Sequence, residues 1–397
     1  MTAVATETGR HTALSIGVVI LIGVFCALLG NTLPVYLEVL ARLRGLSESQ
    51  AGLTAMADMG GYALGIIGCA LLPAVVHRLN WRRTTILGVL LLIATNVLAI
   101  GTAAFVPFLV VRFFAGIGAG IATAIVYAAL AEGDGARFMA FLSAAMLMSA
   151  SATVPYFSEL ADRYGVRGLF GMFAGLGVLA LLLTPLMPRG SARMPKASPH
   201  AQPIADKVTL QGWLAVLSVF VHWCGVGAVF GFISSMGTAW GGTEAAVELS
   251  VSKMLLAGMV GVILVAIVGS RFGSFRSLMV GYVGLLAALT LLLVLKPLAS
   301  FLVVCALFGF IYNLMIPYQF EVVTKIDESS GAAMLVSAGM LGGVAIGPAI
   351  AGYLVTPDYT WVNGFSIASC ALASVLMLVA RRWHHSTSQA RLAPANG

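Results

Sequence analysis

Apolar stretches of about 20 residues, separated by short polar gaps, follow one another along the whole chain. An α-helix needs about 20 apolar residues to cross the hydrocarbon core of a bilayer. Of the 397 residues, 60% are hydrophobic and only 9% are charged, which is more apolar than a soluble domain of this size requires. The sequence therefore predicts an all-α membrane protein with twelve transmembrane helices. The stretches lie near residues 12–37, 48–72, 84–103, 106–130, 137–160, 166–187, 209–236, 249–270, 276–295, 299–323, 331–355 and 361–381.

A polar segment rich in Pro, Ser, Arg and Ala separates the sixth stretch from the seventh, and this composition is typical of a flexible linker. The two parts that it separates resemble each other. The segment FLVV at 108–111 recurs at 301–304, an offset of 193, and the same offset relates Gly116 to Gly309. We therefore expect an approximate internal duplication. The expected units are a six-helix bundle at 1–187, a cytoplasmic linker at 188–208 and a second six-helix bundle with a short tail at 209–397.

Positive charge is concentrated in the gaps on one predicted side of the membrane. The net charge is +7, but Lys and Arg form no basic stripe with interleaved aromatic residues, so nucleic acid is not indicated as a partner. If the N-terminus lies inside, fifteen Lys and Arg residues lie in cytoplasmic segments and five lie on the opposite side. Cytoplasmic loops carry such an excess. We expect a multi-pass protein of the inner (cytoplasmic) membrane with both termini in the cytoplasm.

Motifs of soluble enzymes and of metal sites are absent from the sequence. The five Cys residues show no CxxC spacing, which argues against a disulfide framework and against a zinc site. A Walker A loop, a GxSxG elbow and an HExxH motif are also missing. The GIGAG run lies inside an apolar helix without a preceding strand, so it is not a dinucleotide loop. We expect no enzyme activity, no cofactor and no metal.

Three local motifs resemble those of one transporter family. RFFAGIGAG at 112–120 is similar to an Arg followed by closely spaced small residues in the fourth helix, PAVVHRLNWRR at 73–83 provides the basic loop after helix 2, and LADRYGVR at 160–167 follows helix 5. With the two six-helix halves, they make nearly the whole chain resemble the major facilitator superfamily. The usual Gln is Ala115 here and the usual Asp of the basic loop is His77. The Gly-Pro pair of the antiporter motif is absent from helix 5.

The resemblance implies transport by alternating access, in which two bundles rock around a site near the midplane of the membrane. It places helices 1, 4, 7 and 10 around the central cavity and favours a functional monomer. It also assigns the basic loops after helices 2 and 8 to gating. The gating candidates are Arg78, Arg82, Arg83, Arg271 and Arg276.

Embedded ionisable residues are functional candidates, because a charge in the hydrocarbon region is costly. Asp58 lies about nine residues into helix 2 and Arg112 about six into helix 4, so at ~1.5 Å per residue they lie at comparable depth. Burial raises a carboxyl pKa and a nearby Arg lowers it, so Asp58 is a candidate for proton coupling. Arg112 is a candidate for coupling or for binding an anionic substrate. Alternatively, the two form a static ion pair that stabilises the first bundle.

Other polar residues inside the spans are weaker candidates. His222 lies near the middle of helix 7, and its ordinary pKa suits proton exchange or substrate binding; a neutral, hydrogen-bonded histidine is the rival interpretation. Tyr312 and Asn313 in helix 10 suit hydrogen bonding to a substrate, as do Asn31 and Tyr36 in helix 1. Each of these four could instead link helices to one another.

The residues that could line the path are mostly apolar and aromatic. We therefore predict a secondary active transporter that moves a small amphipathic or aromatic molecule, with proton-coupled efflux as the leading hypothesis. Proton-coupled uptake of an organic or aromatic acid, with Arg112 as the anion anchor, is the alternative. A membrane sensor or assembly partner that transports nothing is a third hypothesis, although it predicts a long soluble extension and the tails are short. The expected partners are a small-molecule substrate, protons and the lipid bilayer.

Overall fold

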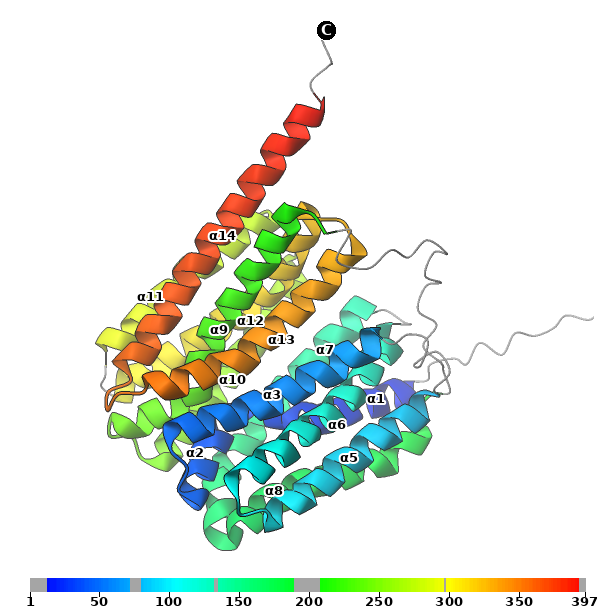
Figure 1. Cartoon of the computed structure of the whole chain (residues 1–397), viewed down its shortest axis with the longest axis vertical. Helices are drawn as coiled ribbons and strands as arrows, with labels where there is room; N and C mark the ends of the chain where they lie inside the picture. Colours follow the sequence, from blue (N-terminus) through cyan, green and yellow to red (C-terminus); the bar gives the residue numbers. More distant parts are fainter. Residues whose placement is uncertain (1–12, 72–79, 132–134, 189–207, 296–297, 393–397) are drawn as a thin grey trace, which may run out of the picture.

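The computed structural model describes residues 13–71, 80–131, 135–188, 208–295 and 298–392, and its elements are all helices (Figure 1). The predicted all-α fold is therefore confirmed. The first half contains α1 (Ala13–Asn31), α2 (Leu33–Arg44), α3 (Glu48–Leu71), α5 (Trp81–Gly101), α6 (Phe105–Ala131), α7 (Gly135–Thr153) and α8 (Phe157–Leu183). The second half contains α9 (Leu210–Ala239), α10 (Glu244–Val268), α11 (Ser274–Val294), α12 (Leu298–Ile326), α13 (Ser330–Leu354) and α14 (Thr360–Leu392).

Two of the helix boundaries do not coincide with the ends of the apolar stretches. The first stretch is divided between α1 and α2 because Pro34, in the first turn of α2, has no N–H to donate to the preceding turn. The Thr32 hydroxyl donates to the carbonyl oxygen of Leu28 at 2.9 Å and stabilises the junction. In α8, Gly165 has φ 58° and ψ −145°, a conformation that glycine adopts readily. The chain reverses there, so Gly165 separates the fifth span from the sixth.

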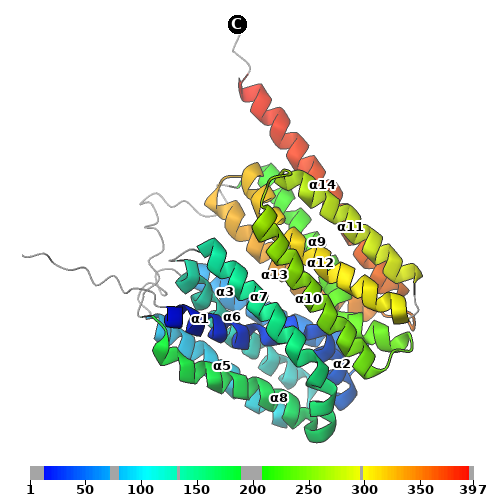
Figure 2. The ribbon, with the colours of Figure 1, turned by 180° about the vertical axis from the view of Figure 1, so that it is seen from behind.

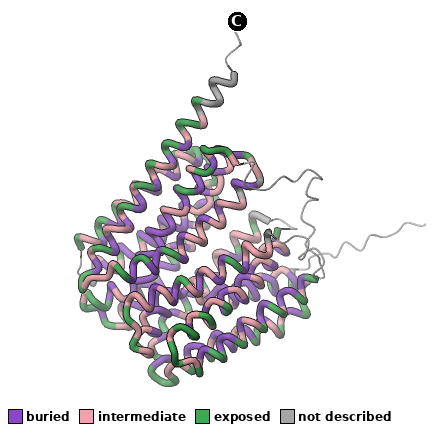
Figure 3. Tube along the Cα trace, in the orientation of Figure 1, coloured by how far each residue is buried: buried purple, intermediate pink, exposed green. Residues whose placement is uncertain are grey.

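The number of spans agrees with the prediction from the sequence. Ten stretches of the described residues are long and apolar enough to cross a membrane, and one of them, Arg137–Leu186, contains the two spans that meet at Gly165. The twelfth is α3, whose 24 residues reach about 36 Å at ~1.5 Å per residue, which exceeds the thickness of the hydrocarbon core. Large apolar side chains such as Leu182, Val280 and Val283 remain exposed, and lipid would cover them. Exposed positions recur along the helices of both halves (Figure 3).

The helices of each half pack mainly on one another. In the first half α6 contacts α1, α3 and α5, and in the second half α12 contacts α10 and α11 while α9 contacts α13 and α14. Gly116 of α6 lies against the backbone of α3, and Gly309 of α12 lies against the backbone of α10, so the repeated glycine has the same packing role in both halves. The predicted linker falls largely in residues 189–207, which lie outside the described part of the chain.

The halves contact each other mainly through the helix pairs α3 with α13, α7 with α10, and α2 with α9. We call the end of the molecule that contains the start of α9 the linker side, and the opposite end the distal side. Figures 1 and 2 show the halves converging at the distal side and diverging toward the linker side. This arrangement determines where a cavity between them can open.

Candidate functional site

A cavity of about 520 Å³ lies between the two halves. Helices α1, α3, α5, α6, α7 and α8 contribute its wall in the first half, and α10, α12 and α13 contribute the wall in the second half. Most of the lining side chains are apolar, among them Phe25, Met59, Met146, Ile316 and Phe320. Among the described residues that line it, only Asp58 and Arg112 are charged. The cavity therefore combines a large apolar surface with one charged position.

Asp58 and Arg112 form an ion pair, with 2.6 Å between the Asp58 carboxylate oxygen Oδ1 and the Arg112 guanidinium nitrogen Nη2. Both side chains are only 1% exposed. Glycines bring their helices together, because a Cβ on Gly116 would collide with the carbonyl oxygen of Asp58 itself. On another face of α6, a Cβ on Gly118 would lie 2.6 Å from the carbonyl oxygen of Gly88. The small residues after Arg112 in the sequence motif thus set the close packing that brings the two charges together.

Neighbouring polar and aromatic groups complete the surroundings of this pair. Arg112 Nη1 donates to Asn96 Oδ1 of α5 at 3.1 Å, and Asn96 Nδ2 donates to the carbonyl oxygen of Leu92 at 2.8 Å. The Arg112 guanidinium carbon lies 5.2 Å from the ring centroid of Phe170 and 5.8 Å from that of Tyr36. The Tyr36 hydroxyl lies close to the Asp58 carboxylate. The cation is therefore held by a carboxylate, an amide and two aromatic rings.

Sequence reasoning did not single out Asn96, although an Asn in the middle of an apolar stretch could have indicated it. Of the helix 1 candidates, Asn31 lines the cavity, and its Nδ2 donates to the carbonyl oxygen of Ala27 at 3.1 Å. Tyr36 is fully buried and does not line it. The ring of Tyr36 packs edge-on against Phe170 and Phe173 at centroid distances of 6.4 and 5.9 Å.

In the second half, the adjacent candidates of α12 occupy different environments. Asn313 lines the cavity, and its Nδ2 donates to the carbonyl oxygen of Gly309 at 2.9 Å. Gly258 of α10 leaves room for this amide, because a Cβ there would collide with it. Tyr312 does not line the cavity and packs against the rings of Trp223 and Phe308. The first half thus provides charge and the second half provides an amide.

His222 lies away from the cavity. It is fully buried, and its ring lies edge-on to those of Trp223 and Tyr282 at centroid distances of 5.7 and 5.2 Å. Neither ring nitrogen has a hydrogen-bond partner among the described residues. Its neighbour Trp223 donates from Nε1 to Gln319 Oε1 at 2.9 Å, which links α9 to α12. The structure therefore does not bring His222 together with Asp58 and Arg112.

The gating candidates are distributed over the linker side. Arg78 lies outside the described residues, whereas Arg82 donates from Nε to the carbonyl oxygen of Met187 at 2.8 Å and Arg83 is exposed. Arg271 and Arg276 are exposed and line a separate cavity between the start of α11, the end of α12 and α14. No group of three or more His, Cys, Asp or Glu residues that could hold a metal ion occurs within the described ranges.

Polar contacts join the two halves at the distal side. Arg42 of α2 pairs with Asp162 at 3.2 Å within its own half and with Glu244 of α10 at 2.9 Å across the interface. The Tyr359 hydroxyl donates to Glu48 Oε1 at 2.9 Å, and the hydroxyls of Ser151 and Ser252 lie 2.8 Å apart. These contacts close the distal end, so the cavity opens toward the linker side.

The backbone N–H of Ser158 also donates a hydrogen bond to Oε1 of Glu248 in α10, at 2.9 Å. At the same end α3 and α13 pack through Gly52, where a Cβ would collide with the carbonyl oxygen of Pro348. The distal closure therefore includes close backbone packing as well as polar contacts. The polar contacts can break one at a time, whereas the glycine contact requires the two helices to separate.

Comparisons with known proteins agree with this architecture. A model of the Major Facilitator Superfamily matches residues 20–334. The structure is similar to a crystal structure of the nucleoside transporter NupG, with a TM-score of 0.77 and 11% identity over 93% of this chain and 99% of that chain. It is also similar to a crystal structure of a D-xylose-proton symporter, with a TM-score of 0.70 and 16% identity over 92% and 95% of the two chains. No curated protein sequence matches.

Proposed function

The chain belongs to the Major Facilitator Superfamily, a family of membrane transporters and not of enzymes, and we propose that it couples proton movement to the efflux of a small amphipathic or aromatic molecule. The single observation that carries this proposal is the buried ion pair of Asp58 and Arg112 on the wall of the central cavity. Alternating access moves such a cavity from one side of the membrane to the other.

The ion pair is the proposed proton switch. While the two groups are paired, their charges cancel and the cavity wall is neutral. Uptake of a proton by Asp58 removes the negative charge, so Arg112 loses its strongest partner and the wall becomes positive. A change of one charge in a place shielded from water is large enough to alter both substrate affinity and helix packing. Protonation and substrate binding are thereby coupled at one position.

The composition of the cavity wall supports the proposed class of substrate. Apolar side chains line most of it, and amide groups of Asn31, Asn96 and Asn313 are spread over both halves. A pocket of this kind orients a mainly apolar molecule through a few polar contacts. A volume of about 520 Å³ is within the range of small-molecule sites.

The proposed orientation follows from the positive charge in the loops. It places both termini and the linker side in the cytoplasm. We also propose that the protein lies in the inner membrane of the cell and that its functional unit is a monomer. The described conformation then faces inward. A mostly apolar cavity that opens to the cytoplasm suits the capture of amphipathic molecules for export.

One observation favours a second candidate, the proton-coupled uptake of an organic or aromatic acid. Arg112 is the only cation that lines the cavity in the described part of the chain. When Asp58 is protonated, the Arg112 guanidinium can bind a carboxylate of the substrate in place of Asp58. Arg suits that role because it binds carboxylates bidentately. In this candidate the proton and the anion bind together, whereas in efflux by antiport they bind in alternation.

The test uses proteoliposomes with a pH-sensitive dye trapped inside, to which candidate compounds are added one at a time from outside. As a compound enters, antiport moves protons out and makes the lumen alkaline, whereas symport moves protons in and makes it acidic. We expect alkalinisation for wild type and no pH change for Asp58→Asn. The control is Glu328→Gln, which removes an exposed carboxylate outside the cavity and should retain the wild-type signal.

Three outcomes would count against the proposal. Acidification by the wild type would replace efflux by the uptake candidate. Substrate entry without any pH change would show that protons are not coupled to transport. Equal pH changes for wild type and Asp58→Asn would make the ion pair purely structural.

A further inference from the structure

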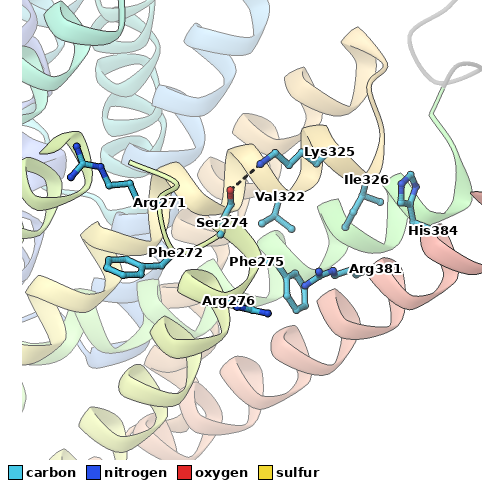
Figure 4. Close-up of a pocket in the computed structure, with 11 residues that line it drawn as sticks. Arg271, Phe272, Ser274, Phe275, Arg276, Val322, Lys325, Ile326, Arg381 and His384 are labelled. Atoms are coloured by element: carbon cyan, nitrogen blue, oxygen red, sulfur yellow. Dashed lines mark hydrogen bonds between the residues drawn. The ribbon is translucent and has the colours of Figure 1, made fainter. Parts of the chain in front are cut away.

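A second cavity, of about 490 Å³, lies outside the transport path at the linker side of the second half. It is formed where α11 begins, α12 ends and α14 passes both of them (Figure 4). Arg271, Arg276, Lys325, Arg381 and His384 line it, together with apolar residues such as Phe272 and Phe275. No Asp or Glu is among the described residues that line it. The cavity is therefore strongly basic.

The basic side chains are held in place around this cavity. The Arg381 guanidinium carbon lies 3.8 Å from the ring centroid of Phe275, which fixes its position. Lys325 Nζ donates to the hydroxyl of Ser274 at 3.1 Å and pairs with Glu321 at 2.5 Å. In Figure 4, Arg276 lies near Arg381. Arg276 lines the cavity and forms no ion pair within the described ranges, so its charge has no carboxylate partner there.

The backbone adds to this positive potential. Helix α11 starts directly after Gly273, which has φ 83° and provides no side-chain cap. The first amide N–H groups of a helix have no partner within the helix and carry the positive end of its dipole. Gly273, Ser274, Phe275 and Arg276 all line the cavity, so this uncapped helix start is part of its wall. Backbone amides and arginines at such a place match the oxygens of a phosphate group.

The position of the cavity along the helices indicates the source of the phosphate. The apolar span of α12 ends at Ile326, and that of α11 begins at Ser274, so the cavity lies where the hydrocarbon region meets the headgroups. Phe272, which lines the cavity, is 73% exposed, and Val280 and Val283 are exposed further along α11. A soluble anion would gain nothing from contact with this apolar surface, whereas the acyl chains of a lipid would pack against it.

We propose that this cavity binds the phosphate headgroup of an anionic phospholipid, with the acyl chains lying along the outer face of α11. Such a lipid bridges the start of α11, the end of α12 and α14, which are three separate elements of the second half. Its binding is independent of the proposed proton switch, because the cavity shares no lining residue with the central cavity.

The experiment measures lipid binding to the detergent-purified full chain by microscale thermophoresis. Phosphatidylglycerol is compared with phosphatidylcholine of the same acyl chains, and glycerol phosphate serves as a soluble probe. We expect tighter binding of phosphatidylglycerol, with about a fivefold loss of affinity for Arg276→Gln and for Arg381→Gln and about 25-fold for the double variant. The matched control is Arg382→Gln, which removes the next, exposed arginine of α14, one that does not line the cavity.

The possible results separate clearly. Selective binding of phosphatidylglycerol that is lost in the two lining variants and kept in Arg382→Gln supports the proposal. Equal affinity for the two lipids, or equal losses in all three arginine variants, overturns it. Binding of glycerol phosphate as tight as that of the lipid also overturns it, because the site would then serve a soluble anion. Size-exclusion chromatography of each variant confirms that its fold is intact before binding is measured.

Discussion

Removal of one member of the ion pair should destabilise the protein far more than removal of both. We consider Asp58→Asn, Arg112→Gln and the double variant, which together form a double-mutant cycle. The paired atoms are 2.6 Å apart and both side chains are 1% exposed, so water screens the interaction little. At an effective dielectric constant near 20, two unit charges about 4 Å apart attract each other by ~4 kcal/mol.

The two single changes should not have equal effects. Asp58→Asn leaves a guanidinium that stays charged and buried, and breaking a buried pair in this way costs about 3–5 kcal/mol of unfolding free energy. After Arg112→Gln, the remaining carboxylate can bind a proton and become neutral, so the loss should be smaller. The double variant leaves two neutral amides, so it avoids the cost of an uncompensated buried charge. We therefore expect the double variant to be more stable than Asp58→Asn alone.

The free energy of unfolding can be measured by titrating each purified variant with denaturing detergent. The coupling energy between the two sites should amount to several kcal/mol. Additive losses, with the double variant destabilised by the sum of the two single effects, would refute the reasoning. The double variant also separates stability from transport, because a folded protein without Asp58 should still fail to move protons in proteoliposomes.

Three further predictions concern packing, the distal contacts and pH. Gly116→Ala should lower the free energy of unfolding by about 1–3 kcal/mol, because the added Cβ collides with α3. The control Gly175→Ala should not lower it, because nothing lies within 4 Å of a Cβ there. Thermal melts of both variants test this difference. Arg42→Gln should weaken the distal closure by ~0.2–1 kcal/mol, since the side chains of its partners are exposed. Spin labels on α2 and α10 should then show a larger population with the distal side open, and an unchanged population would show that Arg42 does not contribute to closure. Burial raises the pKa of Asp327, but hydrogen bonds from Ser329 and Thr209 outweigh it and hold the pKa below its usual value. Its stabilising effect should therefore be complete above the pKa of an unfolded Asp and disappear as the pH falls through the lower folded-state pKa, and acid melts of Asp327→Asn should lack this loss.

Counting residues from the helix ends was enough to place Asp58 and Arg112 at the same depth. The same counting could not place the aromatic candidates. Tyr312 lies on α12, which lines the cavity, and Tyr36 lies on α2, directly after the cavity-lining end of α1. Both side chains nevertheless pack between helices. Asn96 contacts Arg112 directly, yet it lies on a helix for which the family resemblance indicates no role in the cavity. Depth along a helix follows from sequence position, whereas the direction of a side chain follows from packing.

The sequence by itself determined the number of spans and the position of buried charge along each helix. The physical reason is that the bilayer requires about 20 apolar residues per span and tolerates few charges within them. Only the tertiary structure decided which face of each helix lines the cavity and which end is closed. In a soluble helix the polar face reveals the rotation about the axis, but here lipid-facing and protein-facing surfaces are both apolar. The rotation depends instead on close contacts between helices, such as that of Gly116 with α3, which form only when the helices pack.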